Sequence, residues 1–273
     1  MIHGPVVVRR WVVPVPGLPA QADGFQIAHI SDLHLYRWHR ALQHAQTLLL
    51  GLQYDLLVVT GDLCDQPYRW EVAAALTQRF FGPIRPRLGT FAVLGNHDSV
   101  QLADQSDLPV TFLRNGHVTR PIKGGRLVLA GVEQAGDGES DLTATLGAIP
   151  AHLPTILLAH FPSTAFELNQ RAVPLVLSGH THGGQVRLPV VGCVWTADRL
   201  PCRMARGLHV VNGRSLHVSA GLGVPRKFPL RFMCPPEITI LTLAAAGQPC
   251  TPKFTVPRPR AADRTQLAEP IPA

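Results

Sequence analysis

Polar side chains of the types that bind metal ions stand at five places along this chain, each directly after a short apolar run. In order they are Ser-Asp-Leu-His at 31–34, Gly-Asp at 61–62, Gly-Asn-His-Asp at 95–98, His160 and Gly-His-Thr-His at 179–182. Carboxylate, amide and imidazole ligands without thiolate suit Mn²⁺, Fe, Zn²⁺ or Mg²⁺. Two such ions about 3.5–4 Å apart clamp a phosphate, and a water that bridges them becomes a nucleophile near neutral pH. The set therefore predicts a binuclear metal site.

The spacing of two of these groups favours convergence on one small volume. Asp32 and His34 are separated by one residue, so in an extended chain their side chains leave the same face. His180 and His182 repeat that spacing. A single histidine at a strand end is more often an ordinary polar residue, and it is the joint pattern that favours a metal site.

The other groups indicate a division of roles. Asn96 and His97 are adjacent and should diverge, so that one binds metal while the other faces substrate. As an imidazolium, His97 could donate a proton to a leaving oxygen. Asp62 alone would suit a turn, but a short carboxylate there could also bridge two cations. Glycines precede three of the polar groups, as expected where backbone turns tightly beside a ligand: Gly61, Gly95 and Gly179.

The apolar runs predict the elements that position these side chains. They are Phe25–Ile30, Leu56–Thr60, Thr90–Leu94, Thr155–Ala159 and Leu175–Leu177. Short runs rich in Val, Ile and Leu that stop at Gly or Asp are typical of buried strands. In open α/β sheets, ligands bind at the carboxyl ends of such strands. We therefore expect the five groups to meet at one sheet edge.

The rest of the chain predicts an α/β fold. Helical spacing is expected over 39–52, 68–81, 100–103 and 141–148, and further strands over 6–13, 110–113, 126–131, 216–219 and 237–243. The strand at 6–13 should lie at a sheet edge and close at Pro14 and Pro16. The economical arrangement is a sandwich of two mixed sheets flanked by helices. We expect a single domain over residues 1–246 and a Pro- and Arg-rich C-terminal tail over 247–273.

Composition limits the setting and the partners. The chain has 273 residues, 46% of them hydrophobic, and a net charge of +7, which favours phosphate-bearing partners such as phosphorylated metabolites, nucleic acid or an anionic membrane. Five cysteines without C-x-x-C spacing argue against a disulfide framework and a structural zinc site. Neither a secretory signal nor a transmembrane helix is expected. We predict a cytoplasmic location, with peripheral contact at the inner membrane as a second option.

The polar groups, in this order, resemble the calcineurin-like metallophosphoesterase superfamily: D-x-H, G-D, G-N-H-[DE], a later H and G-H-x-H. The resemblance implies a four-layer α/β-β/α sandwich. It also implies one metal held by Asp32, His34 and His182, a second held by Asn96, His160 and His180, and Asp62 bridging the two. His97 would then contact phosphate and assist the leaving group, with Asp98 orienting it. Mn²⁺ is the favoured metal.

Later segments resemble one bacterial branch of that superfamily. They are GHTHGGQVRLP at 179–189, RGLHVVNGRSLHVSAGLG at 206–223 and PLRFMCPPEITILTL at 229–243. The branch contains phosphodiesterases similar to UDP-2,3-diacylglucosamine pyrophosphatase of lipid A biosynthesis, which implies a lipid-linked nucleotide as substrate. Phosphoprotein phosphatases carry an Arg before G-N-H, where this chain has Leu94, so that activity is disfavoured. The segment GLGVPRKFPLR at 221–231 could touch anionic lipid, or be a surface loop beside the site.

Three functional hypotheses follow. The leading one is a two-metal hydrolase that cleaves a phosphodiester or pyrophosphate bond in a small or lipid-linked phosphoester; it predicts no specific nucleic-acid partner. The nearest rival is a nucleotide- or nucleic-acid-directed phosphodiesterase, since basic charge serves it equally. A non-catalytic metal-binding interaction module is the third, and the intact His97 argues against it.

Overall fold

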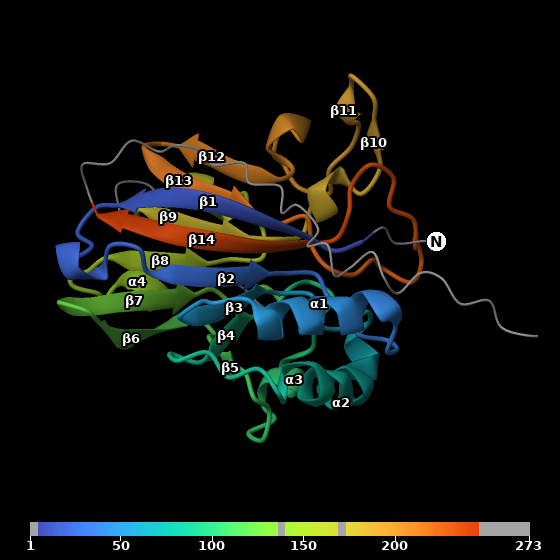
Figure 1. Cartoon of the computed structure of the whole chain (residues 1–273), viewed down its shortest axis with the longest axis horizontal. Coiled ribbons are helices and arrows are strands. Elements are labelled where there is room, and N and C mark those ends of the chain that lie inside the picture. The colour runs from blue at the N-terminus through green and yellow to red at the C-terminus, as the bar shows by residue number, and fades with distance from the viewer. Residues whose placement is uncertain (1–4, 136–139, 169–172, 246–273) are drawn as a thin grey trace, which may run out of the picture.

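Two six-stranded sheets pack face to face, with helices against the outer face of each (Figure 1). The computed structural model describes residues 5–135, 140–168 and 173–245. The C-terminal tail expected over 247–273 lies outside the described residues.

The first sheet brings three site strands together. Its order is β1-β14-β2-β3-β4-β5, and all neighbours are parallel except β14 and β2. The strands are β1 (Val7–Val15), β2 (Gln26–Ile30), β3 (Leu56–Thr60), β4 (Thr90–Val93), β5 (Thr111–Phe112) and β14 (Glu237–Ala245). Because β2, β3 and β4 are parallel neighbours, their carboxyl ends meet at one edge of the sheet.

The second sheet supplies the other two site strands. Its order is β12-β13-β9-β8-β7-β6, with antiparallel pairs only at the two margins. The strands are β6 (Gly116–Ile122), β7 (Gly125–Gly131), β8 (Thr155–Leu158), β9 (Leu175–Ser178), β12 (Gly207–Val211) and β13 (Arg214–Val218). A separate hairpin pairs β10 (Arg187–Leu188) with β11 (Gly192–Cys193). Both sheets are mixed, as the sequence predicts.

The helices are short. They are α1 (Arg40–Gly51), α2 (Trp70–Phe81), α3 (Val100–Ala103), α4 (Leu142–Leu146) and α5 (Thr164–Glu167), with 3₁₀ turns η1 (Ala20–Ala22), η2 (Pro67–Arg69), η3 (His182–Gly184) and η4 (Cys202–Met204). Among the described residues, no helix has both the length and the apolar character needed to cross a bilayer.

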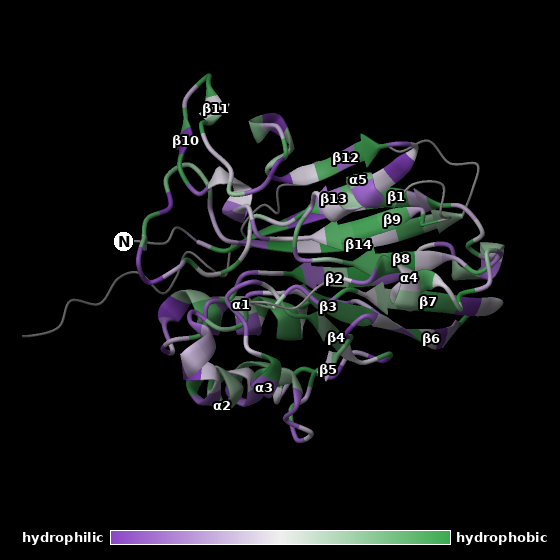
Figure 2. Cartoon of the chain, turned by 180° about the vertical axis from the view of Figure 1, so that it is seen from behind, coloured by the Kyte–Doolittle hydropathy of each residue, from purple (hydrophilic) through white to green (hydrophobic). Residues whose placement is uncertain are grey.

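Alternation along the strands creates the four layers. On β3, Leu56 and Val58 face the second sheet, while Leu57 and Val59 pack against α1 and α2. A third apolar cluster lies on the outer face of the second sheet and includes residues of α4, α5 and η4. Strands in the middle of the sheets, such as β8 and β9, are mainly apolar in Figure 2, whereas α1 and α2 mix polar and apolar residues. The arrangement is the α/β-β/α sandwich expected from the resemblance.

The strongest periodic segments are predicted to within one or two residues. The helix expected over 39–52 is α1, and the helix expected over 68–81 is a 3₁₀ turn followed by α2, which ends at Phe81 before Gly82-Pro83. The strand expected over 6–13 lies at the sheet edge, as predicted, but it continues through Pro14 to Val15. An edge strand tolerates proline because the backbone on its outer side makes no hydrogen bonds to another strand, so the missing N–H of proline is not needed there.

Two strands of the second sheet were not expected. β6 and β12 are its margins, and their sequences, GHVTRPI and GLHVV, are only partly buried. A margin strand contacts one neighbour and lacks the continuous apolar run of a central strand. The four described cysteines, Cys64, Cys193, Cys202 and Cys234, are free thiols, and Cys250 lies outside the described residues.

A pair of buried histidines joins the two sheets. His29 on β2 and His217 on β13 are fully buried, and their Nδ1 atoms are 3.0 Å apart. The Nε2 of His29 is 2.8 Å from Oγ1 of Thr60. Burial lowers the pKa of His29 to about 3 and holds the pKa of His217 well below its usual range, with His29, His209 and Arg9 adding to the second effect. The pair is therefore neutral in the folded protein.

We expect this pair to make the fold acid-sensitive. Unfolded histidines take up protons below pH about 6.5 and the folded pair does not, so the free energy of unfolding falls as pH falls from about 6.5 toward 3. At pH 5 the loss is on the order of 2 kcal/mol per histidine. Thermal unfolding at several pH values should show a shallower acid slope for His217→Asn, whereas His44→Asn, at an exposed position on α1, should keep the wild-type slope. Equal slopes for all three proteins would contradict this prediction.

Candidate metal centre

The loops after β2 and β3 continue to pair beyond the ends of the strands. The backbone N–H of Asp32 donates to the carbonyl of Gly61 at 3.0 Å, and that of His34 donates to the carbonyl of Asp62 at 3.0 Å. One residue further, the N–H of Leu35 donates to the carbonyl of Leu63 at 2.7 Å. These bonds fix the positions from which the first polar groups project.

Site side chains leave backbone in the left-handed region. The φ angles are +52° at Asp32, +45° at His34, +53° at Asp62, +67° at His180 and +49° at His182. Such angles are uncommon for residues other than glycine and concentrate at functional sites. The premise that Asp32 and His34, and likewise His180 and His182, leave extended backbone is therefore wrong. The side chains converge because of this unusual backbone, held by the neighbouring loops.

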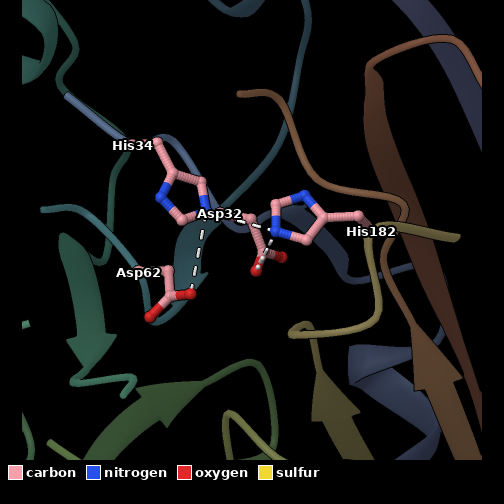
Figure 3. Close-up of side chains that lie close together, drawn as sticks. All are labelled: Asp32, His34, Asp62 and His182. Atoms are coloured by element: carbon pink, nitrogen blue, oxygen red, sulfur yellow. Dashed lines mark hydrogen bonds and ion pairs between the residues drawn. The ribbon is translucent and has the colours of Figure 1, made fainter. Parts of the chain in front are cut away.

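Four side chains form a first group that could hold a cation (Figure 3): Asp32, His34, Asp62 and His182. One ligand atom from each lies within 4.8 Å of those of the others. The two Nε2 atoms of His34 and His182 are 3.2 Å apart. A carboxylate oxygen of Asp62 is 3.7 Å from the first of these nitrogens, and one of Asp32 is 3.6 Å from the second.

A second group shares Asp62 with the first. Ligand atoms of Asp62, His160 and His180 also lie within 4.8 Å of one another. The Nε2 of His160 is 3.4 Å from Asp62 Oδ2, 3.2 Å from His180 Nδ1 and 3.1 Å from the Oδ1 of Asn96. The structure thus brings seven of the nine expected site residues into two groups with one common carboxylate.

Burial sets the protonation of these groups. It lowers the pKa of His34 to about 3 and that of His180 to about 4, and it holds the pKa of His182 well below the usual range. Burial also raises the pKa of Asp32 to about 6. His34, His180 and His182 are therefore neutral near pH 7, as metal ligation requires.

Two members of the second group form a charged pair. Burial alone would lower the pKa of His160, but Asp62 raises it to about 9. Burial likewise disfavours the Asp62 carboxylate, but His160 and His34 hold its pKa well below the usual range. The centre thus contains a buried negative charge that requires a positive one beside it.

The donor set fits two divalent cations. In each group, imidazole nitrogens and carboxylate oxygens converge within 4.8 Å of one another, so one cation can accept a lone pair from all of them once the imidazoles are neutral. The absence of thiolate suits Mn²⁺, Fe, Zn²⁺ or Mg²⁺ over softer metals. The residues present are thus compatible with the two ions expected from the sequence.

Gly61, Gly95 and Gly179 are explained better by the close approach of neighbouring atoms to their Cα positions than by the need for a tight turn. Only Gly61 has a positive φ, +85°. A Cβ on Gly95 would lie 2.7 Å from the backbone nitrogen of Asp62 and 2.8 Å from the His160 ring, and one on Gly179 would lie 2.6 Å from the Asp32 carboxylate. Real Cβ atoms essentially never come that close, so these positions have no room for a side chain.

The adjacent side chains of Asn96 and His97 have different neighbours. Asn96 lies beside His160 in the second group. The ring of His97 packs edge-on against His34, with centroids 5.0 Å apart, and its Nδ1 is 2.9 Å from the carbonyl oxygen of Asp65. A carbonyl only accepts, so Nδ1 carries the proton and Nε2 is left for another partner.

Comparison with known proteins places these residues in a family. The protein family described as "Calcineurin-like phosphoesterase" matches residues 25–184 of this chain. The match covers more than half of the chain and includes all nine expected site residues. The chain belongs to this family.

Relatives of this phosphoesterase match along most of its length. The metallophosphoesterase YkuE of Bacillus subtilis is 32% identical over 240 residues, covering 84% of this chain and 82% of its own. The phosphodiesterase YaeI of Escherichia coli is 28% identical over 231 residues, covering 81% and 83%. A transmembrane protein with a metallophosphoesterase domain from Danio rerio is 30% identical over 256 residues, covering 86% of this chain and 56% of its own.

One expected contact of this phosphoesterase is absent. Asp98 does not orient the ring of His97: its two oxygens accept the backbone N–H groups of Cys64, at 2.7 Å, and Gly95, at 2.8 Å. The expectation is wrong because the carboxylate joins the loops after β3 and β4, while the carbonyl of Asp65 takes the His97 ring. Burial, with Asp62 nearby, raises the pKa of Asp98 to about 7.

Two further residues around the phosphoesterase centre were missed. Asp65 is buried, accepts from His97 through its carbonyl, and accepts from the N–H of Arg226 at 2.7 Å through its carboxylate. Arg231 is buried and donates to the carbonyl of Gly223 at 2.6 Å, with its guanidinium 3.5 Å from His182. Asp65 stands three residues after Asp62, a spacing that could have drawn attention to it. For Arg231, nothing in the sequence other than its positive charge indicates a place beside the centre.

Proposed function

We propose that this phosphoesterase hydrolyses a phosphodiester or pyrophosphate bond at a binuclear metal centre. The observation that carries the proposal is the position of Asp62, whose carboxylate belongs to both ligand groups. A carboxylate between two cations holds them near the separation at which they share one phosphoryl group. The relative named phosphodiesterase YaeI supports this reaction class.

In this proposal each group has its own ligands. Asp32, His34, Asp62 and His182 would hold one ion, and Asp62, Asn96, His160 and His180 the other. When bound, the ions supply Lewis acidity toward the phosphoryl oxygens and lower the pKa of a coordinated water. Mn²⁺ is the first candidate, with Fe, Zn²⁺ and Mg²⁺ as alternatives, because carboxylate, amide and imidazole suit all of them.

His97 acts on the leaving group. The hydrogen bond from its Nδ1 to the carbonyl of Asp65 fixes the ring, so that Nε2 is the atom presented to substrate. The N–H of the same residue donates to Asp62 Oδ1 at 2.9 Å, which ties the ring position to the shared carboxylate. As an imidazolium, the ring donates from Nε2 to the oxygen that departs.

We expect the effect of removing His97 to depend on the leaving group. General acid catalysis contributes about 10²–10⁴-fold where a poor leaving group needs a proton, and little where an aryl oxide departs unaided. His97→Asn should therefore reduce kcat on an alkyl phosphodiester by at least about 10²-fold and on a nitrophenyl diester far less. His152→Asn, at an exposed position, is the matched control and should change neither rate. Equal losses on the two substrates would rule out proton donation by His97.

The substrate we propose is a lipid-linked nucleotide similar to UDP-2,3-diacylglucosamine, met by an enzyme at the periphery of the cytoplasmic membrane. Support comes from the resemblance of the segments at 179–189, 206–223 and 229–243 to that branch, and from exposed basic and apolar residues beside the centre. The net charge of +7 equally favours a nucleotide- or nucleic-acid-directed phosphodiesterase. Polynucleotide binding would weaken steeply with salt, whereas binding of a small lipid-linked nucleotide would weaken much less.

A phosphoester panel tests the proposal. Purified protein, loaded separately with Mn²⁺, Mg²⁺, Fe²⁺ and Zn²⁺, would be assayed on monoesters, aryl diesters, dinucleotides, single-stranded oligonucleotides and UDP-2,3-diacylglucosamine. We expect diester or pyrophosphate turnover with at least one metal and the highest kcat/KM on the lipid-linked substrate. Turnover of monoesters alone, or none at all, would refute the reaction class; a preference for oligonucleotides would select the rival.

A further inference from the structure

Exposed apolar side chains gather in two segments beside the metal centre. We name residues 187–195, which contain β10 and β11, the apolar hairpin, and residues 226–233 the basic loop. Their large exposed apolar residues are Leu188, Val190, Val191, Val194 and Trp195 in the hairpin, and Phe228, Leu230, Phe232 and Met233 in the loop. Val190 is fully exposed and Trp195 is 70% exposed, although solvent exposure of an indole is unfavourable.

Hydrogen bonds join the two segments into one surface. The N–H of Arg187 donates to the carbonyl of Phe232 at 2.9 Å, and the N–H of Phe232 donates to the carbonyl of Gln185 at 3.0 Å. The side-chain amide of Gln185 also donates to the carbonyls of Phe228 and Leu230, at 2.6 and 3.0 Å. The hairpin and the loop therefore present their apolar residues together, as one docking surface. In Figure 1 this surface lies at the end of the molecule opposite the β6–β7 turn, and the hairpin tip is apolar in Figure 2.

The docking surface lies next to the metal centre in the structure. Just after the hairpin, the carbonyl of Ala197 lies 3.4 Å from the Nε2 of His180. The basic loop begins at Arg226, whose N–H donates to the carboxylate of Asp65, the residue that fixes His97. A molecule seated on the docking surface would thus lie beside the metal centre.

The charge of the docking surface selects its occupant. Residues 183–197 and 219–236 contain no Asp or Glu, while Arg226 and Lys227 are exposed at the start of the basic loop and Arg187 is half-buried in the hairpin. A second copy would bring these cations against one another. An anionic bilayer instead offers hydrocarbon to the apolar side chains and phosphates to the basic ones.

We propose that the docking surface inserts the apolar hairpin and the apolar residues of the basic loop into an anionic bilayer, with Arg226 and Lys227 at the headgroups. This inference deepens the proposed membrane contact and rests on it, but not on hydrolysis. Trp195 at the interface is typical of membrane-facing surfaces, where one side of the ring is apolar and its N–H stays wet. Binding in this orientation directs the metal centre toward a substrate held in the same membrane.

Vesicle binding tests the docking surface directly. The full-length protein would be sedimented with vesicles of phosphatidylcholine containing about 30% phosphatidylglycerol, and with phosphatidylcholine vesicles alone. We expect binding to the anionic vesicles and a blue shift of tryptophan emission, because Trp195 is the exposed one among the four tryptophans, all of which are described. Val190→Ser with Val191→Ser and Trp195→Ser should weaken binding on the order of 100-fold. Arg226→Gln with Lys227→Gln should weaken it roughly 30-fold.

Matched controls lie at the opposite end or on other faces. Lys123→Gln with Arg126→Gln removes two exposed charges near the β6–β7 turn, and Leu50→Ser with Phe166→Ser removes two exposed apolar side chains elsewhere. Both control double variants should bind vesicles as the wild-type protein does. The hairpin triple variant should keep the wild-type rate on a soluble aryl diester, which shows that it is folded and separates docking from hydrolysis.

Several outcomes would overturn the inference. They are no binding to anionic vesicles, equal binding to neutral ones, or equal weakening by the control variants. A dimer in light scattering that the hairpin substitutions dissociate, without vesicle binding, would identify a second copy as the occupant instead. Vesicle binding by a protein that hydrolyses no phosphoester would support the docking surface while refuting the proposed function.

Discussion

Asp62→Asn should weaken both metal-binding steps and lower kcat on a diester by about 10³-fold or more. The substitution keeps the shape of the side chain but removes the charge that the two ligand groups share. Metal ions supply several kcal/mol of transition-state stabilisation, and about 4 kcal/mol corresponds to about 10³ in rate. Kinetics and calorimetric titration with Mn²⁺ measure the two effects on the same protein.

A second variant separates a shared ligand from an ordinary one. His180 belongs only to the second group, so His180→Ala should weaken one binding step and leave the other near its wild-type affinity. Asp55→Asn is the matched control because it removes the same charge from the other end of β3: Asp55 comes just before this strand, and Asp62 comes just after it. Asp55 forms an ion pair with the largely exposed Arg87 and belongs to neither ligand group. Asp55→Asn should leave both steps and kcat unchanged. Weakening of a single step by Asp62→Asn would refute the bridging role.

The elements that carry the centre were predictable because their signal is local. The site strands β2, β3, β8 and β9 are short and rich in Val, Ile and Leu, and each ends where Ser, Gly or Ala precedes a polar group. Buried parallel strands need apolar residues on both faces, which leaves a continuous run in the sequence. The carboxyl ends of parallel neighbours then coincide, so the clustering follows from topology.

The backbone of the ligand loops could not be predicted in the same way. Asp32 and His34 adopt positive φ because their N–H groups donate to the carbonyls of Gly61 and Asp62, more than 25 residues away. Nothing in the local sequence S-D-L-H distinguishes that conformation from an extended one. The two side chains converge, as expected from the sequence, but they do so because of this positive-φ backbone and not because of an extended strand.

Tertiary partners also explain the other differences. The family resemblance implied that Asp98 orients His97, yet the oxygens of Asp98 accept from the backbone N–H groups of Cys64 and Gly95, which belong to separate loops. The apolar hairpin lacks the alternation of a half-buried strand because it packs against no sheet, and its Val and Trp residues resemble core until their exposure is known. Burial, which depends on the whole fold, separates a core residue from a docking residue.

Gly95→Ala should abolish metal binding and activity although it adds only a methyl group. The new Cβ would lie 2.7 Å from the backbone nitrogen of Asp62, 2.8 Å from the ring of His160 and against the Asp62 carboxylate. None of these is the free end of a flexible chain, so the loops after β3 and β4 must separate. Overpacking of this kind costs about 1–3 kcal/mol of stability, and it displaces the shared carboxylate and a ligand of the second group together.

Metal-dependent thermal unfolding distinguishes damage to the centre from general instability. A ligand at about 100 times its Kd stabilises the fold by about 2.7 kcal/mol, so Mn²⁺ should raise the wild-type Tm and leave that of Gly95→Ala nearly unchanged. Gly51→Ala, at the end of α1, is the matched control because its Cβ would have no atom within 4 Å. It should keep the full metal response and gain about 0.5–1 kcal/mol from the lower entropy cost of ordering alanine. A wild-type metal response in Gly95→Ala would show that the two loops can separate without displacing Asp62, and the rigid centre inferred from these contacts would then be wrong.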